Sequence, residues 1–124
     1  MIIELCLATA LFFEARNQPI DGQMAVAEVI LNRVEDPQWP DTICGVVNQE
    51  KQFSFTHDGK SDNPLRYNDT IAWKVAQTVA TDAQRGINLL GLTSTHYHTT
   101  AIKPSWRLNL TIDGIIGDHI FYSK

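Results

Sequence analysis

Apolar residues dominate the segment from Ile2 to Phe13 and recur at helical spacing in two later segments. The first segment is apolar on nearly every side, as in a central helix, and the turn Asn17-Gln18-Pro19 ends it. Asp21 is a plausible N-cap for the second segment, and Gly86 lies just beyond the third. A further helical turn is expected after Pro40. The pattern thus predicts helices over residues 2–16, 21–35, 42–48 and 69–85.

In the last third of the chain, the helical spacing of apolar residues gives way to short segments typical of strands. Short segments rich in β-branched and aromatic residues predict strands over 95–99, 108–112 and 119–122, with turns at Asp113-Gly114 and Gly117-Asp118. Helices first and strands last are typical of an α+β domain. We therefore expect one domain over residues 1–124, in which a helical core and a small antiparallel sheet form a groove between them.

One glutamate stands where the first apolar segment meets its turn. Glu14 follows two phenylalanines and precedes Ala15 and Arg16, so its carboxyl group is expected to leave the core beside aromatic rings. Desolvation there would disfavour the charged form and raise the pKa, which suits a proton donor near neutral pH. A solvated Glu-x-Arg pair at a helix end, without a catalytic role, is the alternative interpretation.

Composition and charge narrow the class of protein. Of the 124 residues, 44% are hydrophobic and 19% are charged, as is usual for a soluble globular domain. The formal net charge is -4, and the ten Lys and Arg residues form no basic run. Neither nucleic acid nor a membrane surface is therefore an expected partner. We expect a monomer that needs no cofactor.

The two cysteines, Cys6 and Cys44, lack the spacing of a metal or redox motif and are too few for a disulfide scaffold. Buried free thiols are therefore expected, with one bridge between them as the alternative. The N-terminal segment differs from a secretory signal, because Glu4 is acidic where a signal is basic and no cleavage pattern follows. Synthesis in the cytoplasm without an export signal is expected.

Seven short motifs follow one another along the chain, namely Phe13-Glu14-Ala15-Arg16, Ala25-Val26-Ala27 with Leu31-Asn32-Arg33-Val34, Ile43-Cys44-Gly45-Val46-Val47, Gln52-Phe53-Ser54, Thr95-His96-Tyr97-His98, Pro104-Ser105-Trp106 and Ile116-Gly117-Asp118-His119-Ile120-Phe121-Tyr122. In their order and gaps they resemble the SleB/CwlJ-type cell wall hydrolases over almost the whole chain. The resemblance implies a lysozyme-like or lytic-transglycosylase-like fold, cleavage of peptidoglycan, and one catalytic glutamate in the Glu-Ala-Arg motif, here Glu14.

The resemblance also implies a reaction that one carboxyl group can carry out. Conventional glycosidases use two, but no second acid stands in a motif with Glu14. In a lytic transglycosylase the 6-hydroxyl of the muramic sugar attacks. Cleavage of the β-1,4 bond between N-acetylmuramic acid and N-acetylglucosamine then leaves a 1,6-anhydro end. If water attacks instead, the candidate bases are Glu28, Asp21 and Asp58.

Seven residues of these motifs are expected to bind the glycan, namely Gln52, Phe53, Ser54, His96, Tyr97, His98 and Trp106. Their polar groups would hydrogen-bond to sugars, and their aromatic rings would offer flat faces to sugar rings or simply fill the core. Alternation along a strand should place His96 and His98 on one side and Tyr97 on the other. Arg16 is expected to be an ion-pair partner or, alternatively, to touch substrate.

Two alternatives come from other functional classes. His96, His98 and His119 could bind zinc with Glu14 as general base, which would make the protein an N-acetylmuramoyl-L-alanine amidase. The aromatic groove could instead belong to a non-catalytic glycan-binding module. As for the biological setting, a catalytic domain alone fits a phage endolysin that is released from the cytoplasm to the cell wall.

Overall fold

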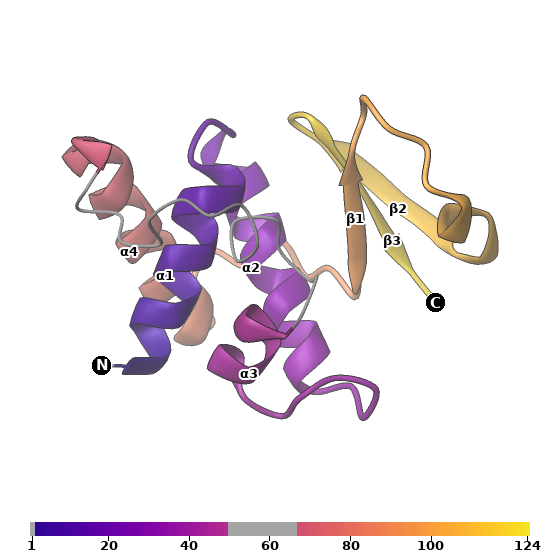
Figure 1. Cartoon of the computed structure of the whole chain (residues 1–124), viewed down its shortest axis with the longest axis horizontal. Helices are drawn as coiled ribbons and strands as arrows, with labels where there is room; N and C mark the ends of the chain where they lie inside the picture. The colour runs from indigo at the N-terminus through magenta and orange to yellow at the C-terminus, as the bar shows by residue number, and fades with distance from the viewer. Residues whose placement is uncertain (1, 50–66) are drawn as a thin grey trace.

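The computed structural model describes residues 2–49 and 67–124 (Figure 1). Helices come first and strands last, in the order α1 (Ile2–Ala15), α2 (Ile20–Val34), α3 (Ile43–Asn48), α4 (Thr70–Gln84), β1 (His96–Thr99), the 3-10 helix η3 (Ser105–Asn109), β2 (Thr111–Ile116) and β3 (His119–Ser123). Figure 1 shows the sheet beside the helices, and both β1 and β2 contact α2. The predicted α+β fold is confirmed.

The helix boundaries follow the chemistry of the residues that flank them. Pro19 occupies the N-cap position of α2, two residues before the expected cap Asp21. Asp21 instead lies in the first turn, where its charge suits the helix dipole. The Asp69 side chain caps α4 by accepting a hydrogen bond from the amide of Ala72 at 3.3 Å. Gly86, with a φ of 71°, follows the end of α4 as the sequence predicts.

The core of the domain surrounds α1. Leu7, Leu11 and Phe12 of α1 are fully buried, and Val26 and Ile30 of α2 complete the same cluster. Because α1 packs against α2, α3 and α4, it needs apolar residues on nearly all sides, which explains its weak amphipathic pattern. Within residues 2–49 and 67–124, no helix is long and apolar enough to cross a membrane.

The sheet has the strand order β1-β3-β2, and both pairs are antiparallel. β2 and β3 form a hairpin whose turn contains Gly117 at a φ of 57°, a conformation that favours glycine. The expected strand over 108–112 was placed too early. The amide of Arg107 donates to the carbonyl of Pro104 at 3.2 Å and forms a 3-10 turn, so the strand begins only at Thr111.

The expectation of free thiols was wrong. Cys6 of α1 and Cys44 of α3 form a disulfide bond that joins positions 38 residues apart. Neither cysteine carries a local signal for pairing, and their approach depends on how α3 packs against α1. The bond ties the helix that bears Glu14 to the short helix that precedes residue 50.

Candidate active site

Glu14 lies in the last turn of α1, half-buried, where the helical layer meets the sheet. Its charge acts on Tyr97 of β1. Burial raises the pKa of the Tyr97 hydroxyl, and the negative charge of Glu14 raises it further, against a smaller opposing effect of Arg33. A neutral hydroxyl therefore lies within the electrostatic reach of the Glu14 carboxylate across the junction between α1 and the sheet.

Strand register decides which side chains share the face of Tyr97. Tyr97 pairs with Phe121, and Thr99 pairs with His119, so Tyr97, Phe121 and His119 lie on one face of the sheet. The Tyr97 ring centroid is 5.6 Å from that of Phe121 and 5.0 Å from that of His119. Phe121 is fully buried in the main core. The face that bears Tyr97 is therefore the one that packs toward the helices.

His96 and His98 lie on the opposite face, with Tyr122 and Trp106. The alternation predicted along this strand is thus correct. The strand turns Tyr97 toward the helical core, and the two imidazoles project from the other face of the sheet.

His98 is held by two hydrogen bonds. Its Nδ1 lies 2.7 Å from the carbonyl oxygen of Thr99, which can only accept, so Nδ1 carries the proton. Nε2 is then the acceptor for the Tyr122 hydroxyl at 2.7 Å. With both ring nitrogens engaged and the side chain buried, His98 is a structural residue of the sheet.

The three histidines considered for zinc do not converge. His119 shares the inner face with Tyr97, whereas His96 and His98 share the outer face. Among the residues that the structure describes, no three His, Cys, Asp or Glu side chains are grouped so that they could hold a metal ion. The three-histidine zinc site is therefore incompatible with the register of the sheet.

Trp106 covers the outer face of the sheet from η3. Its ring centroid lies 5.2 Å from that of His96 and 5.6 Å from those of His98 and Tyr122, and about a third of the residue, 36%, is exposed. Trp39, beyond the end of α2, contacts the other side of His96 at 5.5 Å. Trp106 is therefore separated from Glu14 by the sheet. Gln52, Phe53, Ser54 and Asp58 fall outside the described residues.

Arg16 lies over the rings of Phe12 and Tyr67. Its guanidinium carbon is 4.4 Å from the ring centroid of Phe12 and 5.4 Å from that of Tyr67, within the range of cation–π contacts. Tyr67 also contacts Phe13 edge to face at 5.2 Å. Sequence reasoning missed Tyr67 because it belongs to no motif, yet its ring packs beside the turn that bears Glu14.

Glu28, the first candidate base for a hydrolytic reaction, has a structural role. Its buried carboxylate accepts hydrogen bonds from three consecutive amides, those of Leu90 at 2.7 Å and of Gly91 and Leu92 at 2.9 Å. Three backbone donors satisfy the charge that burial would otherwise penalise. Asp21, a second candidate, lies exposed at the start of α2.

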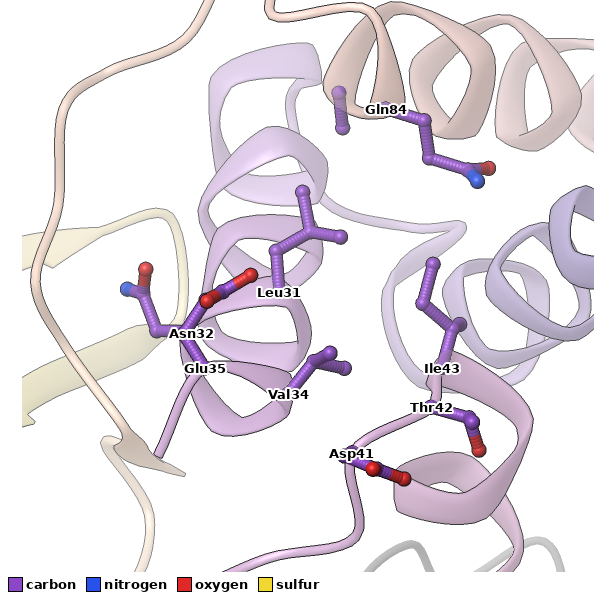
Figure 2. A pocket seen from close by; sticks show the side chains of 9 residues that line it. Leu31, Asn32, Val34, Glu35, Asp41, Thr42, Ile43 and Gln84 are labelled. Atoms are coloured by element: carbon purple, nitrogen blue, oxygen red, sulfur yellow. The ribbon is translucent and has the colours of Figure 1, made fainter. Parts of the chain in front are cut away.

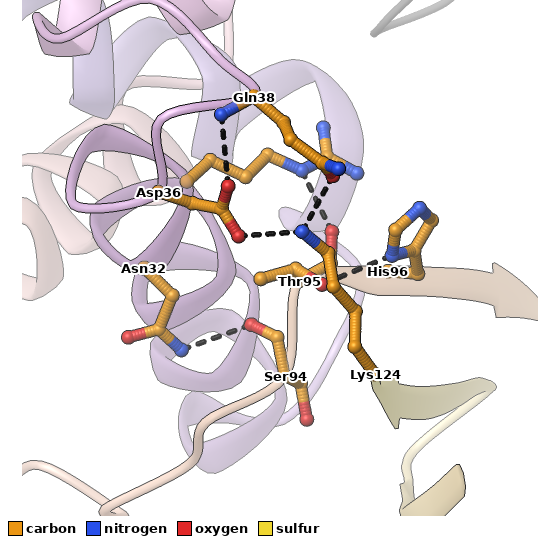
Figure 3. Close-up of polar contacts among 8 residues, drawn as sticks. Asn32, Asp36, Gln38, Ser94, Thr95, His96 and Lys124 are labelled. Atoms are coloured by element: carbon orange, nitrogen blue, oxygen red, sulfur yellow. Dashed lines mark hydrogen bonds and ion pairs between the residues drawn. The ribbon is translucent and has the colours of Figure 1, made fainter. Parts of the chain in front are cut away.

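Two further residues of α2 continue this attachment to the segment before β1. The Asn32 amide donates to the carbonyl oxygens of Leu92 and Ser94 at 2.8 and 2.9 Å, and the bond to Ser94 is drawn in Figure 3. Arg33 Nε donates to the carbonyl oxygen of Thr95 at 2.7 Å. Since Tyr97 follows two residues later, α2 determines where the inner face of β1 lies relative to the helices.

The other end of the sheet is held by the turn after α1. Gln18 Oε1 accepts the amide hydrogen of Asp118 at 2.9 Å, and Gln18 Nε2 donates to Asp118 Oδ2 at 3.1 Å. The sequence contains no signal for this pair, which joins positions 100 residues apart. Both ends of the sheet are thus attached to the helical layer, one through the C-terminal half of α2 and the other through the turn after α1.

A separate cavity of about 490 Å³ lies between α2, α3 and α4 (Figure 2). It is lined by Leu31, Asn32, Val34, Glu35, Asp41, Thr42, Ile43, Ala83 and Gln84. Its α2 residues, Leu31, Asn32 and Val34, belong to the C-terminal half of that helix, whereas Glu14 precedes the N-terminal end of α2. Asn32 and Thr42 already serve as a strand anchor and a helix cap. The cavity is therefore distinct from the site around Glu14.

Comparisons with known proteins identify similar sequences and folds. The model of the family described as Cell Wall Hydrolase matches residues 17–122, a range that begins three residues after Glu14. Spore cortex-lytic enzymes of Oceanobacillus iheyensis and Bacillus cereus are 33% and 32% identical to this chain over 115 residues, 93% of its length. The matches cover 39% and 42% of those proteins, so the chain spans about two fifths of their length.

Solved structures show the same fold. The catalytic domain of the germination-specific lytic transglycosylase SleB from Bacillus anthracis superposes with a TM-score of 0.78 at 29% identity, covering 97% of this chain and 93% of that one. The catalytic domain of the Bacillus cereus SleB protein gives the same TM-score and identity, with 99% and 91% covered. Sequence and fold agree, and the chain belongs to the cell wall hydrolase family.

Proposed function

We propose that this protein cleaves the β-1,4 bond between N-acetylmuramic acid and N-acetylglucosamine in peptidoglycan, with Glu14 as general acid and then general base. The observation that carries the proposal is the position of Glu14, half-buried at the junction of α1 and the sheet, where its charge acts on the hydroxyl of the partly buried Tyr97. The family and the SleB catalytic domains, one of them described as a lytic transglycosylase, support this substrate class.

The reaction that we propose needs no second protein carboxylate. The Glu14 carboxylic acid donates its proton to the glycosidic oxygen as the bond from that oxygen to C1 of the muramic sugar breaks. The sugar's 6-hydroxyl oxygen then bonds to C1, and its proton returns to the Glu14 carboxylate. No water is consumed, and the product carries a 1,6-anhydro bond.

The surroundings of three other acidic residues within the described part of the chain support this single-carboxylate scheme. Glu28 is occupied by three backbone amides, and Asp118 by Gln18. Asp113 accepts hydrogen bonds from Ser94 and Ser123 at 2.5 and 2.9 Å. These carboxylates serve the attachment of the sheet, which favours attack by a group of the substrate over attack by water.

Mass spectrometry of fragments from purified peptidoglycan tests the proposal. Substrate-assisted attack predicts muramic fragments that weigh one water less than hydrolytic products and lack a reducing end. Reducing muramic ends would contradict the transglycosylase step while leaving glycan cleavage in place. Free stem peptides without glycan cleavage would contradict the proposal altogether. An endolysin setting and a monomeric state stay predictions.

A further inference from the structure

A buried amide connects the turn after α1 to the turn between β2 and β3. Gln18 is only 8% exposed, and both ends of its side-chain amide bind Asp118: Oε1 accepts from the backbone N–H, and Nε2 donates to the carboxylate. The amide oxygen of Gln18 thus faces a donor, and the amide nitrogen faces an acceptor.

Close packing against Gly117 and Pro19 restrains the side-chain amide of Gln18. A Cβ atom at Gly117 would collide with Gln18 Oε1 and would lie 3.0 Å from Pro19 Cδ. From the helical side, Gln23 Nε2 donates to the backbone carbonyl of Gln18 at 3.2 Å. The amide is held between the hairpin turn and the first turn of α2, so it cannot shift without moving one of them.

The contact between Gln18 and Asp118 is linked to the candidate site from both sides. Glu14 lies one helical turn before Gln18, and Asp118 directly precedes His119. The His119 ring packs against Tyr97 at 5.0 Å, and the Tyr97 hydroxyl lies within the field of Glu14. The contact between Gln18 and Asp118 therefore joins the turn after α1 to the strand whose His119 packs against Tyr97.

We propose that Gln18 and Asp118 are a positioning pair that sets the separation between the Glu14 carboxyl group and the sheet face bearing Tyr97, and thereby the width of the glycan site. The inference rests on the proposed function of Glu14 and adds two residues that act on it without touching substrate. Displacement of a catalytic group by about 1 Å can lower a rate roughly 100-fold, so the pair controls turnover as well as stability.

The polarity of the amide allows a sharp test. Gln18→Glu replaces the donor Nε2 with an acceptor and places two carboxylates against each other, which opens the contact. Adding Asp118→Asn supplies a new donor at position 118, so that the two hydrogen bonds re-form with one of them reversed. Gln77→Glu, at an exposed position of α4, adds the same charge away from the site and is the matched control.

The experiment measures kcat, KM and thermal midpoint for these variants on purified peptidoglycan. Gln18→Glu is expected to lower kcat per folded molecule about 10- to 100-fold with little change in KM, and the double variant to recover most of the loss. Gln77→Glu should match the unmodified protein.

Two results would overturn the positioning role. One is an unchanged kcat per folded Gln18→Glu molecule despite a lower thermal midpoint, which would make the pair merely structural. The other is a double variant that regains its midpoint but not its kcat. Glu14→Gln is measured in parallel, and full activity of that variant would contradict the proposed function. The positioning role is tested separately, by whether Asp118→Asn restores the kcat that Gln18→Glu loses.

Discussion

Glu14 at the end of α1 and Tyr97 on β1 lie 83 positions apart in the sequence and are electrostatic neighbours in the fold. Burial and, to a smaller extent, the Glu14 carboxylate raise the pKa of the Tyr97 hydroxyl, so Tyr97 stays neutral and can donate a hydrogen bond at neutral pH. This junction places an acidic group and a neutral polar group beside each other in the candidate site.

Glu14→Gln is expected to leave the fold intact and to lower lysis of peptidoglycan by about 10² to 10⁴, because an amide cannot donate and recover the proton. Turbidity clearance with purified cell walls measures the rate, and circular dichroism checks folding. Glu35→Gln, which changes an exposed glutamate beyond α2, is the matched control and should clear normally. Near-normal clearance by folded Glu14→Gln would remove Glu14 from the mechanism.

The raised pKa of Tyr97 predicts that the folded protein becomes less stable at alkaline pH. Its pKa in the folded protein is raised above the reference value of 10.0, so above that pH the unfolded chain releases a proton that the folded chain retains. The free energy of unfolding should then fall as pH rises past about 10. Urea unfolding across this range should show a smaller decline for Tyr97→Phe. Equal declines would mean that the hydroxyl ionises in the fold as it does in water.

Glu28→Ala is expected to destabilise the protein by at least about 2 kcal/mol, because the amides of Leu90, Gly91 and Leu92 lose a charged acceptor. Glu28→Gln keeps one acceptor oxygen and should cost less. At a temperature where each variant is folded, glycan cleavage per molecule should be unchanged. A folded Glu28→Gln protein with greatly reduced turnover would instead support Glu28 as the base of a hydrolytic reaction.

Reduction of the bond between Cys6 and Cys44 is expected to lower the free energy of unfolding by about 2–4 kcal/mol, since the oxidised unfolded chain contains a closed loop between positions 38 residues apart. Thiol titration of the denatured, non-reduced protein should find no free thiol. Cys6→Ser should unfold at the same denaturant concentration as the reduced protein, whether or not reductant is present. Two titratable thiols would show that the bond does not form in solution.

Local patterns in the sequence were sufficient for the helices and for the position of Glu14. Apolar residues recur at helical spacing in α2 and α4, and Pro19 and Gly86 mark helix boundaries. Both signals act over one or two helical turns. These interactions are contained in short stretches of chain, so they can be read without knowing the fold. The same holds for the alternation of His96, Tyr97 and His98, although alternation does not reveal which side faces inward.

Only the tertiary structure decided which groups surround Glu14. Pairing with β3 turned Tyr97 inward and separated His119 from the other histidines, and helix packing joined Cys6 to Cys44. The amides that bind Glu28 lie more than sixty residues away, and the partner of Gln18 lies 100 residues away. Such contacts depend on strand register and on how layers pack. No residue type or spacing encodes them locally. Glu14 could therefore be predicted from the sequence, whereas the residues that surround and support it could not.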